Sequence, residues 1–126
     1  MVRISRAATV IAMFAGPAAA QDVMVFEGAT ASLGIGPGQV ISELAPQDDA
    51  TAALTLSLGS AQAEAFASFT EAQIGRQVAL VICGTEVLRA VVRTRIEGGL
   101  IQTPPLPMEQ AEAAHSALNS AMGCPG

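Results

Sequence analysis

Apolar and polar residues alternate most clearly at positions 53–58, where leucines at every second position are separated by Thr55 and Ser57. A period of two residues is typical of a strand with one buried face. Three further runs, residues 78–83, 86–95 and 100–103, also predict strands. The near-continuous apolar run at 78–83 predicts a central strand, and Gly84-Thr85 after it predicts a two-residue type II′ hairpin turn.

Two other segments carry apolar residues at helical spacing. In residues 61–74, which are rich in Ala, Gln and Glu, Phe66 and Phe69 lie three positions apart, so we expect both to anchor the core. Gly75 is placed to end this helix. A second helix is predicted to begin at Pro107, which is favoured as a first helical residue. Its expected buried stripe is Met108, Ala111, His115, Leu118 and Met122.

These elements follow the order strand, helix, strand, strand, strand, helix, which is ferredoxin-like. We therefore predict an α+β two-layer sandwich, with an antiparallel sheet that carries two helices on one face. Signals before residue 53 are weaker. Residues 23–26 fit a short strand and 34–38 a loop, whereas 39–44 fit either a strand or a helical turn and 46–49 a turn.

The first twenty residues have the pattern of a cleavable signal peptide. Arg3 and Arg6 form a positive region, residues 7–15 are apolar, and three alanines end the segment at Ala20. The apolar run is shorter than the roughly 20 residues that span a bilayer, which disfavours the alternative of an uncleaved anchor. We predict a signal peptide at 1–20, an N-terminal extension at 21–38 and one domain at 39–126. The mature protein is then expected in the periplasm or outside the cell, without an integral membrane span.

The charge balance argues against nucleic-acid binding. Removal of residues 1–20 leaves four arginines against eleven acidic residues, a net charge of −7, and the chain has no Lys. Phosphate recognition needs clustered cations. The chain also lacks Trp and Tyr, so it offers few platforms on which bases or sugars could stack.

Cys83 and Cys124 are the two cysteines. Export would place them in an oxidising compartment, where an even number of cysteines usually forms bridges. We therefore predict a Cys83–Cys124 disulfide. The alternatives are two free thiols or a metal pair, but zinc needs more ligands than the chain offers at recognisable spacing, since His115 is its only histidine.

An arginine-rich stripe is the one candidate binding surface. If residues 86–95 form one strand, Arg89, Val91, Arg93 and Arg95 share a face by the period of two. The planar guanidinium group suits peptide carbonyls and carboxylates, so this stripe is a possible partner surface. The competing interpretation is an ordinary solvated face, since exposed strands commonly carry charges that prevent aggregation.

Other motifs point to no chemistry. His115 has no nucleophile or acid at catalytic spacing and is interpreted as structural. The glycines at 34–38 lack the Lys-Ser/Thr ending of a phosphate loop, and Asp48-Asp49 supply too few oxygens for calcium. We therefore predict that the protein is not an enzyme, and we assign no catalytic, cofactor-binding or metal-binding residue.

Three motifs follow one another at characteristic positions: Phe69-Thr70 with Ile74-Gly75, the Gly84 turn, and the run Ile96-Glu97-Gly98-Gly99 before a further strand. In this order they resemble the head part of the first periplasmic domain of SecD, a protein-export subunit. The resemblance extends over about residues 39–122. We therefore expect a stand-alone head domain, without the transmembrane bundle and without the base part of that SecD domain, and the two cysteines depart from the family pattern.

The resemblance implies a secreted, non-catalytic domain that contacts exported or unfolded polypeptide, or a component of the export apparatus. Sheet-edge pairing is the mode of binding that an extended chain would use. The alternative is a small structural envelope protein that retains the fold without an export role.

Overall fold

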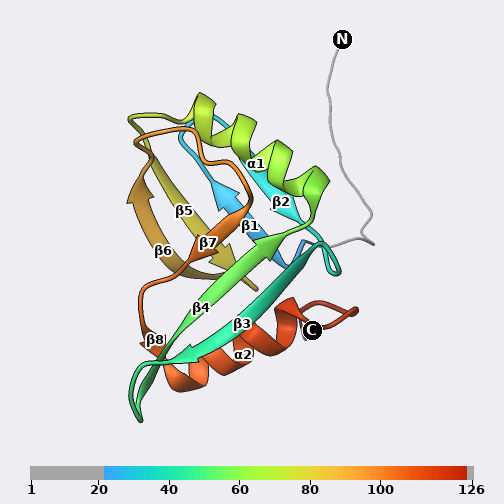
Figure 1. Cartoon of the computed structure of the whole chain (residues 1–126), viewed down its shortest axis with the longest axis vertical. Helices are drawn as coiled ribbons and strands as arrows, with labels where there is room; N and C mark the ends of the chain where they lie inside the picture. The colour runs from blue at the N-terminus through green and yellow to red at the C-terminus, as the bar shows by residue number, and fades with distance from the viewer. Residues whose placement is uncertain (1–21, 125–126) are drawn as a thin grey trace.

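The structure is a computed structural model that describes residues 22–124 (Figure 1). The predicted signal peptide at 1–20 lies outside the described residues. In chain order the elements are β1 (Met24–Glu27), β2 (Ser32–Ile35), β3 (Val40–Pro46), β4 (Thr51–Leu58), α1 (Ser60–Ala72), β5 (Gln77–Ile82), β6 (Thr85–Val91), β7 (Leu100–Gln102), β8 (Leu106–Pro107) and α2 (Met108–Leu118).

The predicted α+β sandwich is confirmed, but its strands divide between two antiparallel sheets. Sheet A has the order β2-β1-β5-β6, and sheet B has the order β3-β4-β7, with β8 also paired to β4. The chain leaves sheet A after Val91, and Gly98 and Gly99 adopt positive φ angles that turn it toward β4. The second half of the chain is therefore shared between the sheets, where the sequence pattern predicted a single one.

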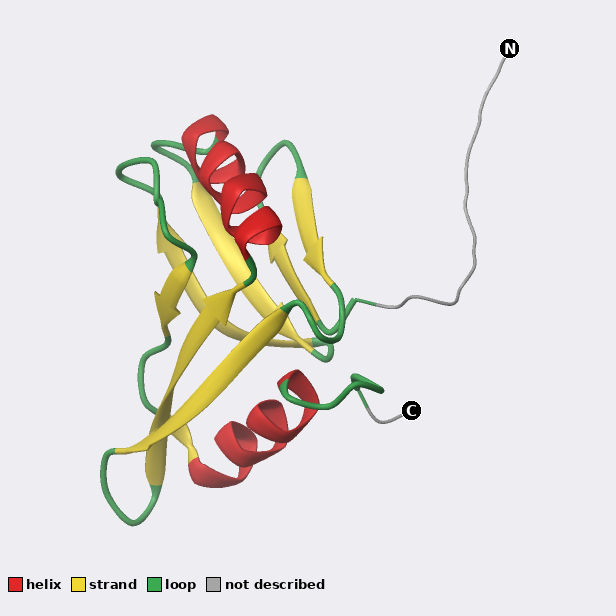
Figure 2. Cartoon of the chain, turned by 45° about the vertical axis from the view of Figure 1, so that its right-hand side comes forward, coloured by secondary structure: helices red, strands yellow, loops and turns green. Residues whose placement is uncertain are grey.

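The helices lie at opposite ends of the molecule (Figure 2) and do not share one sheet face. Helix α1 packs mainly on β2 and β4, whereas α2 packs on β3, β4 and β8. Neither helix therefore provides the main cover for β6. Among the described residues, no helix has the length and apolarity needed to cross a membrane.

The core forms where the inner face of sheet A meets α1. Phe66 and Phe69 are buried, as predicted, and both rings form aromatic pairs with Phe26 of β1. The Phe26 and Phe66 ring centroids lie 4.5 Å apart in a tilted arrangement, which adds to the stabilisation from apolar burial. Leu54 and Leu80, one from each sheet, are fully buried, so a single core joins the two sheets.

The segment before residue 39 contributes two strands to the domain. Strand β1 lies between β2 and β5, and its Met24 and Phe26 side chains are buried. Residues 22–38, which the sequence set apart as an extension, therefore pack with the rest of the fold. The sequence of residues 39–44 fits either a strand or a helical turn. In the structure these residues lie in strand β3, except for Gln39.

The hairpin turn between β5 and β6 is displaced by one residue from the prediction. Ile82 pairs with Thr85, so Cys83-Gly84 is the connection and Thr85 belongs to β6. Cys83 and Gly84 both have positive φ angles, 50° and 83°. Positive φ at both central residues is the pattern of a type I′ turn, so the predicted type II′ turn is wrong.

Candidate functional site

The predicted disulfide between Cys83 and Cys124 is present. The two Cα atoms lie 5.5 Å apart, and the residues are separated by 41 positions in the sequence. The bridge ties the β5–β6 hairpin to the segment that follows α2. It therefore connects sheet A to the helix packed on sheet B, and such a bridge fits an extracytoplasmic protein.

The predicted stripe of Arg89, Val91, Arg93 and Arg95 is divided by the end of β6 at Val91. The prediction of one strand over residues 86–95 is wrong, because the chain bends away from β5 after its last pairs. A register shift near Leu80 also places an irregularity within β6. Arg89 and Val91 therefore lie in the strand, whereas Arg93 and Arg95 lie in the segment that leaves it.

Two of the arginines are engaged by acidic side chains. Arg89 forms an ion pair with Glu86, with an N–O distance of 2.7 Å, and its guanidinium hydrogen bond lowers the pKa of the Glu86 carboxyl. Arg95 forms ion pairs with both Glu71 and Glu97, and its hydrogen bonds to them raise its pKa. These pairs neutralise the charge of Arg89 and Arg95 locally.

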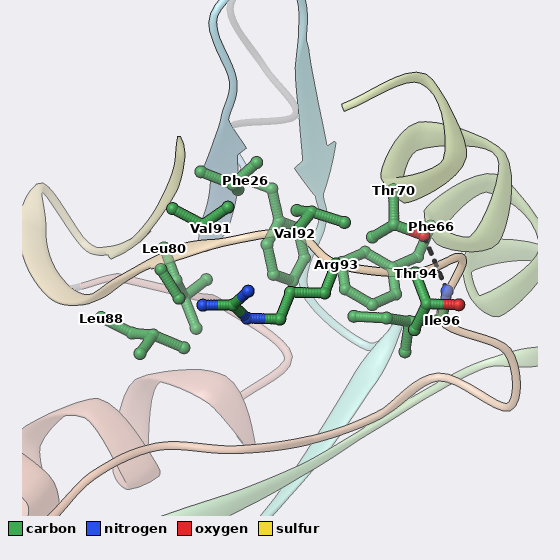
Figure 3. A pocket seen from close by; sticks show the side chains of 12 residues that line it. Phe26, Phe66, Thr70, Leu80, Leu88, Val91, Val92, Arg93, Thr94 and Ile96 are labelled. Carbon is green, nitrogen blue, oxygen red and sulfur yellow. Dashed lines mark hydrogen bonds between the residues drawn. The ribbon is translucent and has the colours of Figure 1, made fainter. Parts of the chain in front are cut away.

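Arg93 differs, because it makes no hydrogen bond or ion pair with any residue in the described part of the chain. Its side chain lines a cavity of about 290 Å³ beneath the inner face of β6, which we call the Arg93 cavity. In Figure 3 the Arg93 side chain runs toward the side of this cavity formed by Leu80 and Leu88. Most of the lining is apolar: Phe26, Phe66, Leu80, Leu88, Val92 and Ile96.

The cavity has a simple origin in the sequence and the topology. Leu88 and Ala90 pair across the ladder with Leu80 and Val78, so these four side chains point to one face of sheet A. Neither helix packs mainly on β6, and Ala90 is small. The cover over this face comes instead from one end of α1 and from residues 92–96, which leave space between them.

Thr70 fixes one wall of the Arg93 cavity. Its hydroxyl donates to the Ala67 carbonyl at 2.9 Å and accepts from the Ile96 N–H at 3.0 Å. The side chain is almost fully buried, so these bonds form away from water and hold the segment at 92–96 against α1. In the Phe69-Thr70 pair, Phe69 thus packs in the core, and Thr70 holds one wall of the cavity in place.

A second polar cluster, unforeseen from the sequence, joins β3 to α2. The Ser42 hydroxyl and His115 Nδ1 are hydrogen-bonded at 2.7 Å. The Asn119 side chain accepts from the Ser42 N–H at 2.9 Å and donates to the Ser42 carbonyl at 3.0 Å. We call Ser42, His115 and Asn119 the polar clamp. No local spacing reveals it, because 73 positions separate Ser42 from His115.

The polar clamp brings a serine and a histidine together, but the serine is not accessible. Ser42 is only 3% exposed, so a substrate carbonyl has no direct approach to its hydroxyl. The geometry instead satisfies backbone and side-chain groups where α2 lies on β3. Among residues 22–124, no group of three His, Cys, Asp or Glu side chains is arranged to hold a metal ion.

Comparison with known proteins identifies a similar fold. No family model and no curated protein matches the chain. A solved structure of SecDF, described as a membrane component that enhances protein export, matches with a TM-score of 0.54 and 24% sequence identity. The match covers 67% of this chain and 38% of the SecDF chain. The domain therefore has a SecD-like fold and corresponds to less than half of that larger protein.

Proposed function

We propose that this protein is an exported, non-catalytic domain that binds an extended segment of another polypeptide along β6. The observation that carries the proposal is the position of β6 at the edge of sheet A, where no described strand pairs with its outer side. An extended chain can hydrogen-bond to such an edge as an added strand. The partner would be an exported or unfolded polypeptide, or a component of the export apparatus.

The side chains around this edge support the proposal. Val91 is 45% exposed at the end of β6, and Arg93 follows it with a guanidinium group that no described residue engages. Arg89 lies on the same strand and retains partly exposed surface beside Glu86. An apolar contact next to cationic donors suits a peptide, whose carbonyl oxygens accept hydrogen bonds.

The proposed location is the periplasm or the cell exterior, reached by removal of the signal peptide at 1–20. The Cys83–Cys124 bridge and the SecD-like fold both support this location. Binding without catalysis is supported by the inaccessible Ser42 and by the likeness to SecDF, an export component.

A small structural envelope protein is the second candidate. The ion pairs of Arg89 and Arg95 favour it, because paired charges on an exposed face are also what an ordinary solvated surface carries. In that case β6 would have no polypeptide partner in the cell.

Charge reversal at the β6 edge separates the two candidates. The Arg89→Glu and Arg93→Glu double variant should lose capture of an unfolded model polypeptide while keeping its melting temperature, because both side chains are exposed. Arg76→Glu, which reverses an exposed charge outside β6, is the control and should still capture it. Equal capture by the double variant and the native protein would refute this surface as the binding site.

A further inference from the structure

We propose that the Arg93 cavity binds a small carboxylate with an unbranched apolar chain, with the carboxylate at Arg93 and the chain inside. This inference does not depend on polypeptide binding at β6. It rests on the volume of the cavity, on its apolar lining, and on the one cationic group that borders it.

The size and the lining suit such a ligand. Pockets that take small molecules are commonly a few hundred Å³, mostly apolar, with a few polar groups that fix orientation, and the Arg93 cavity has about 290 Å³. Side chains from α1 and from three strands of sheet A form one part of its wall, and the segment at 92–96, which Thr70 holds against α1, forms the rest. Water there would find few hydrogen-bond partners, whereas an apolar chain would make dispersion contacts with the exposed lining atoms.

The charge of the preferred head group follows from the arginines. Glu86 engages Arg89, and Glu71 and Glu97 engage Arg95, but Arg93 has no such partner among the described residues. A carboxylate accepts hydrogen bonds from the planar guanidinium fork in a bidentate manner. A neutral or cationic head group would leave this donor unused, so the cavity should discriminate by charge as well as by chain length.

Calorimetric titration of the exported, disulfide-bonded protein tests the proposal. Hexanoate, octanoate and decanoate are added below their micelle-forming concentrations, with decanol as the uncharged probe. We expect one binding site and about fourfold tighter binding for each added methylene until the cavity is full. We also expect decanoate to bind at least about tenfold more tightly than decanol, since a hydrogen bond to a charged group is worth more than one between neutral groups.

Two variants locate the site. Arg93→Gln should weaken decanoate binding about tenfold or more and leave decanol binding unchanged, whereas the matched Arg76→Gln should change neither. Ala90→Phe fills the cavity from an exposed position of β6 and should abolish both. Backbone amide shifts on decanoate addition should be concentrated at residues 88–96.

The proposal is wrong if none of the three carboxylates binds the native protein. It is also wrong if decanol binds as tightly as decanoate, or if Arg93→Gln binds decanoate as well as the native protein does. Normal melting temperatures of Arg93→Gln and Ala90→Phe establish that a lost signal reflects the site and not unfolding. Polypeptide capture by the Arg89 and Arg93 charge-reversal variant tests the proposed function, not the cavity. Its outcome therefore does not change the conclusion from the carboxylate titration.

Discussion

The contact of α2 with β3 and the space beneath β6 are built in opposite ways. In the first, the polar clamp satisfies both backbone groups of the buried Ser42, and Ala111 and Leu118 of α2 are fully buried. In the second, apolar side chains surround an unfilled volume with an arginine beside it. Hydrogen bonds hold α2 against β3, whereas the path of residues 92–96 leaves a space beneath β6.

This difference is why both proposals place binding on the β6 side of the molecule. The hydrogen bonds that Asn119 and His115 make to the buried Ser42 fix how α2 lies on β3. The apolar space beside Arg93, a charge that no residue among 22–124 pairs with, contributes less to stability, and a ligand can occupy it. We therefore expect substitutions on the α2 side to change mainly the free energy of unfolding, and substitutions near β6 to change mainly binding.

The largest effect on stability should follow removal of the disulfide, which joins the two regions. The Cys83→Ser and Cys124→Ser double variant should lose about 4 kcal/mol of unfolding free energy, because the bridge closes a loop of about 40 residues in the unfolded chain. Urea denaturation under oxidising conditions measures the loss. A loss below about 1 kcal/mol would show that the bridge does little to hold the two regions together.

Truncation of one leucine in each region tests the comparison directly. Leu118→Ala should cost about 3 kcal/mol, because the Leu118 side chain of α2 is fully buried, whereas Leu88→Ala should cost about 1 kcal/mol, because Leu88 is half-buried beside an existing space. Urea denaturation of both variants gives the two values. Equal losses would contradict the view that the β6 side is less tightly packed.

Removal of the Asn119 side-chain amide from the polar clamp should have an intermediate effect on the free energy of unfolding. Asn119→Ala leaves the Ser42 N–H and carbonyl without the side-chain partner that binds both, so we expect a loss of about 1.5 kcal/mol. Ser120→Ala, at the neighbouring position, removes only an exposed hydrogen bond and should cost no more than about 0.5 kcal/mol. If Asn119→Ala matched this control, the polar clamp would not contribute to stability.

The smallest effects concern two exposed carboxylates. Hydrogen bonds from the backbone N–H groups of Ala50 and Thr51, and from the Thr51 hydroxyl, lower the pKa of Asp48, whereas the Arg89 side chain lowers that of Glu86. Both groups favour the folded state above the ordinary carboxyl pKa of about 4. That contribution is lost as the pH falls through the lowered folded-state pKa.

NMR titration with and without 1 M salt distinguishes the causes of these shifts. Added salt screens exposed ion pairs, so the pKa of Glu86 should return toward its ordinary value while that of Asp48 stays low. Arg89→Gln should have the same effect on Glu86 as salt. A similar response of both groups to salt would mean that local backbone hydrogen bonds do not control Asp48.

Much of the fold follows from local signals. The alternating leucines of β4, the Phe66 and Phe69 spacing of α1 and the apolar run of β5 all predict elements that the structure contains. The disulfide pairing also followed, because two cysteines allow only one intramolecular bridge. Strand β2 had no such signal, since its four residues include Gly34 and overlap the glycine-rich segment interpreted as a loop.

The division into two sheets and the candidate site depend on long-range packing. Residues 86–95 alternate as one strand would, but the chain bends after Val91, and only the three-dimensional path brings Arg93 to the cavity. By the same period of two, Leu88, Ala90 and Val92 share the face opposite Arg89 and Val91, and two helices packed on one sheet would cover such an apolar face. Both helices pack on β4 and neither packs mainly on β6, so this face of β6 is only partly covered, and no pattern in the sequence specifies that outcome.

The most direct test of polypeptide binding at β6 is photocrosslinking in the native envelope. A photoreactive residue replaces Val91, and a second protein carries it at the exposed Glu64 on α1 as the control. We predict that Val91 forms adducts with export components or with many exported chains, and that Glu64 does not. No adduct at Val91 above the Glu64 control would contradict the proposed function.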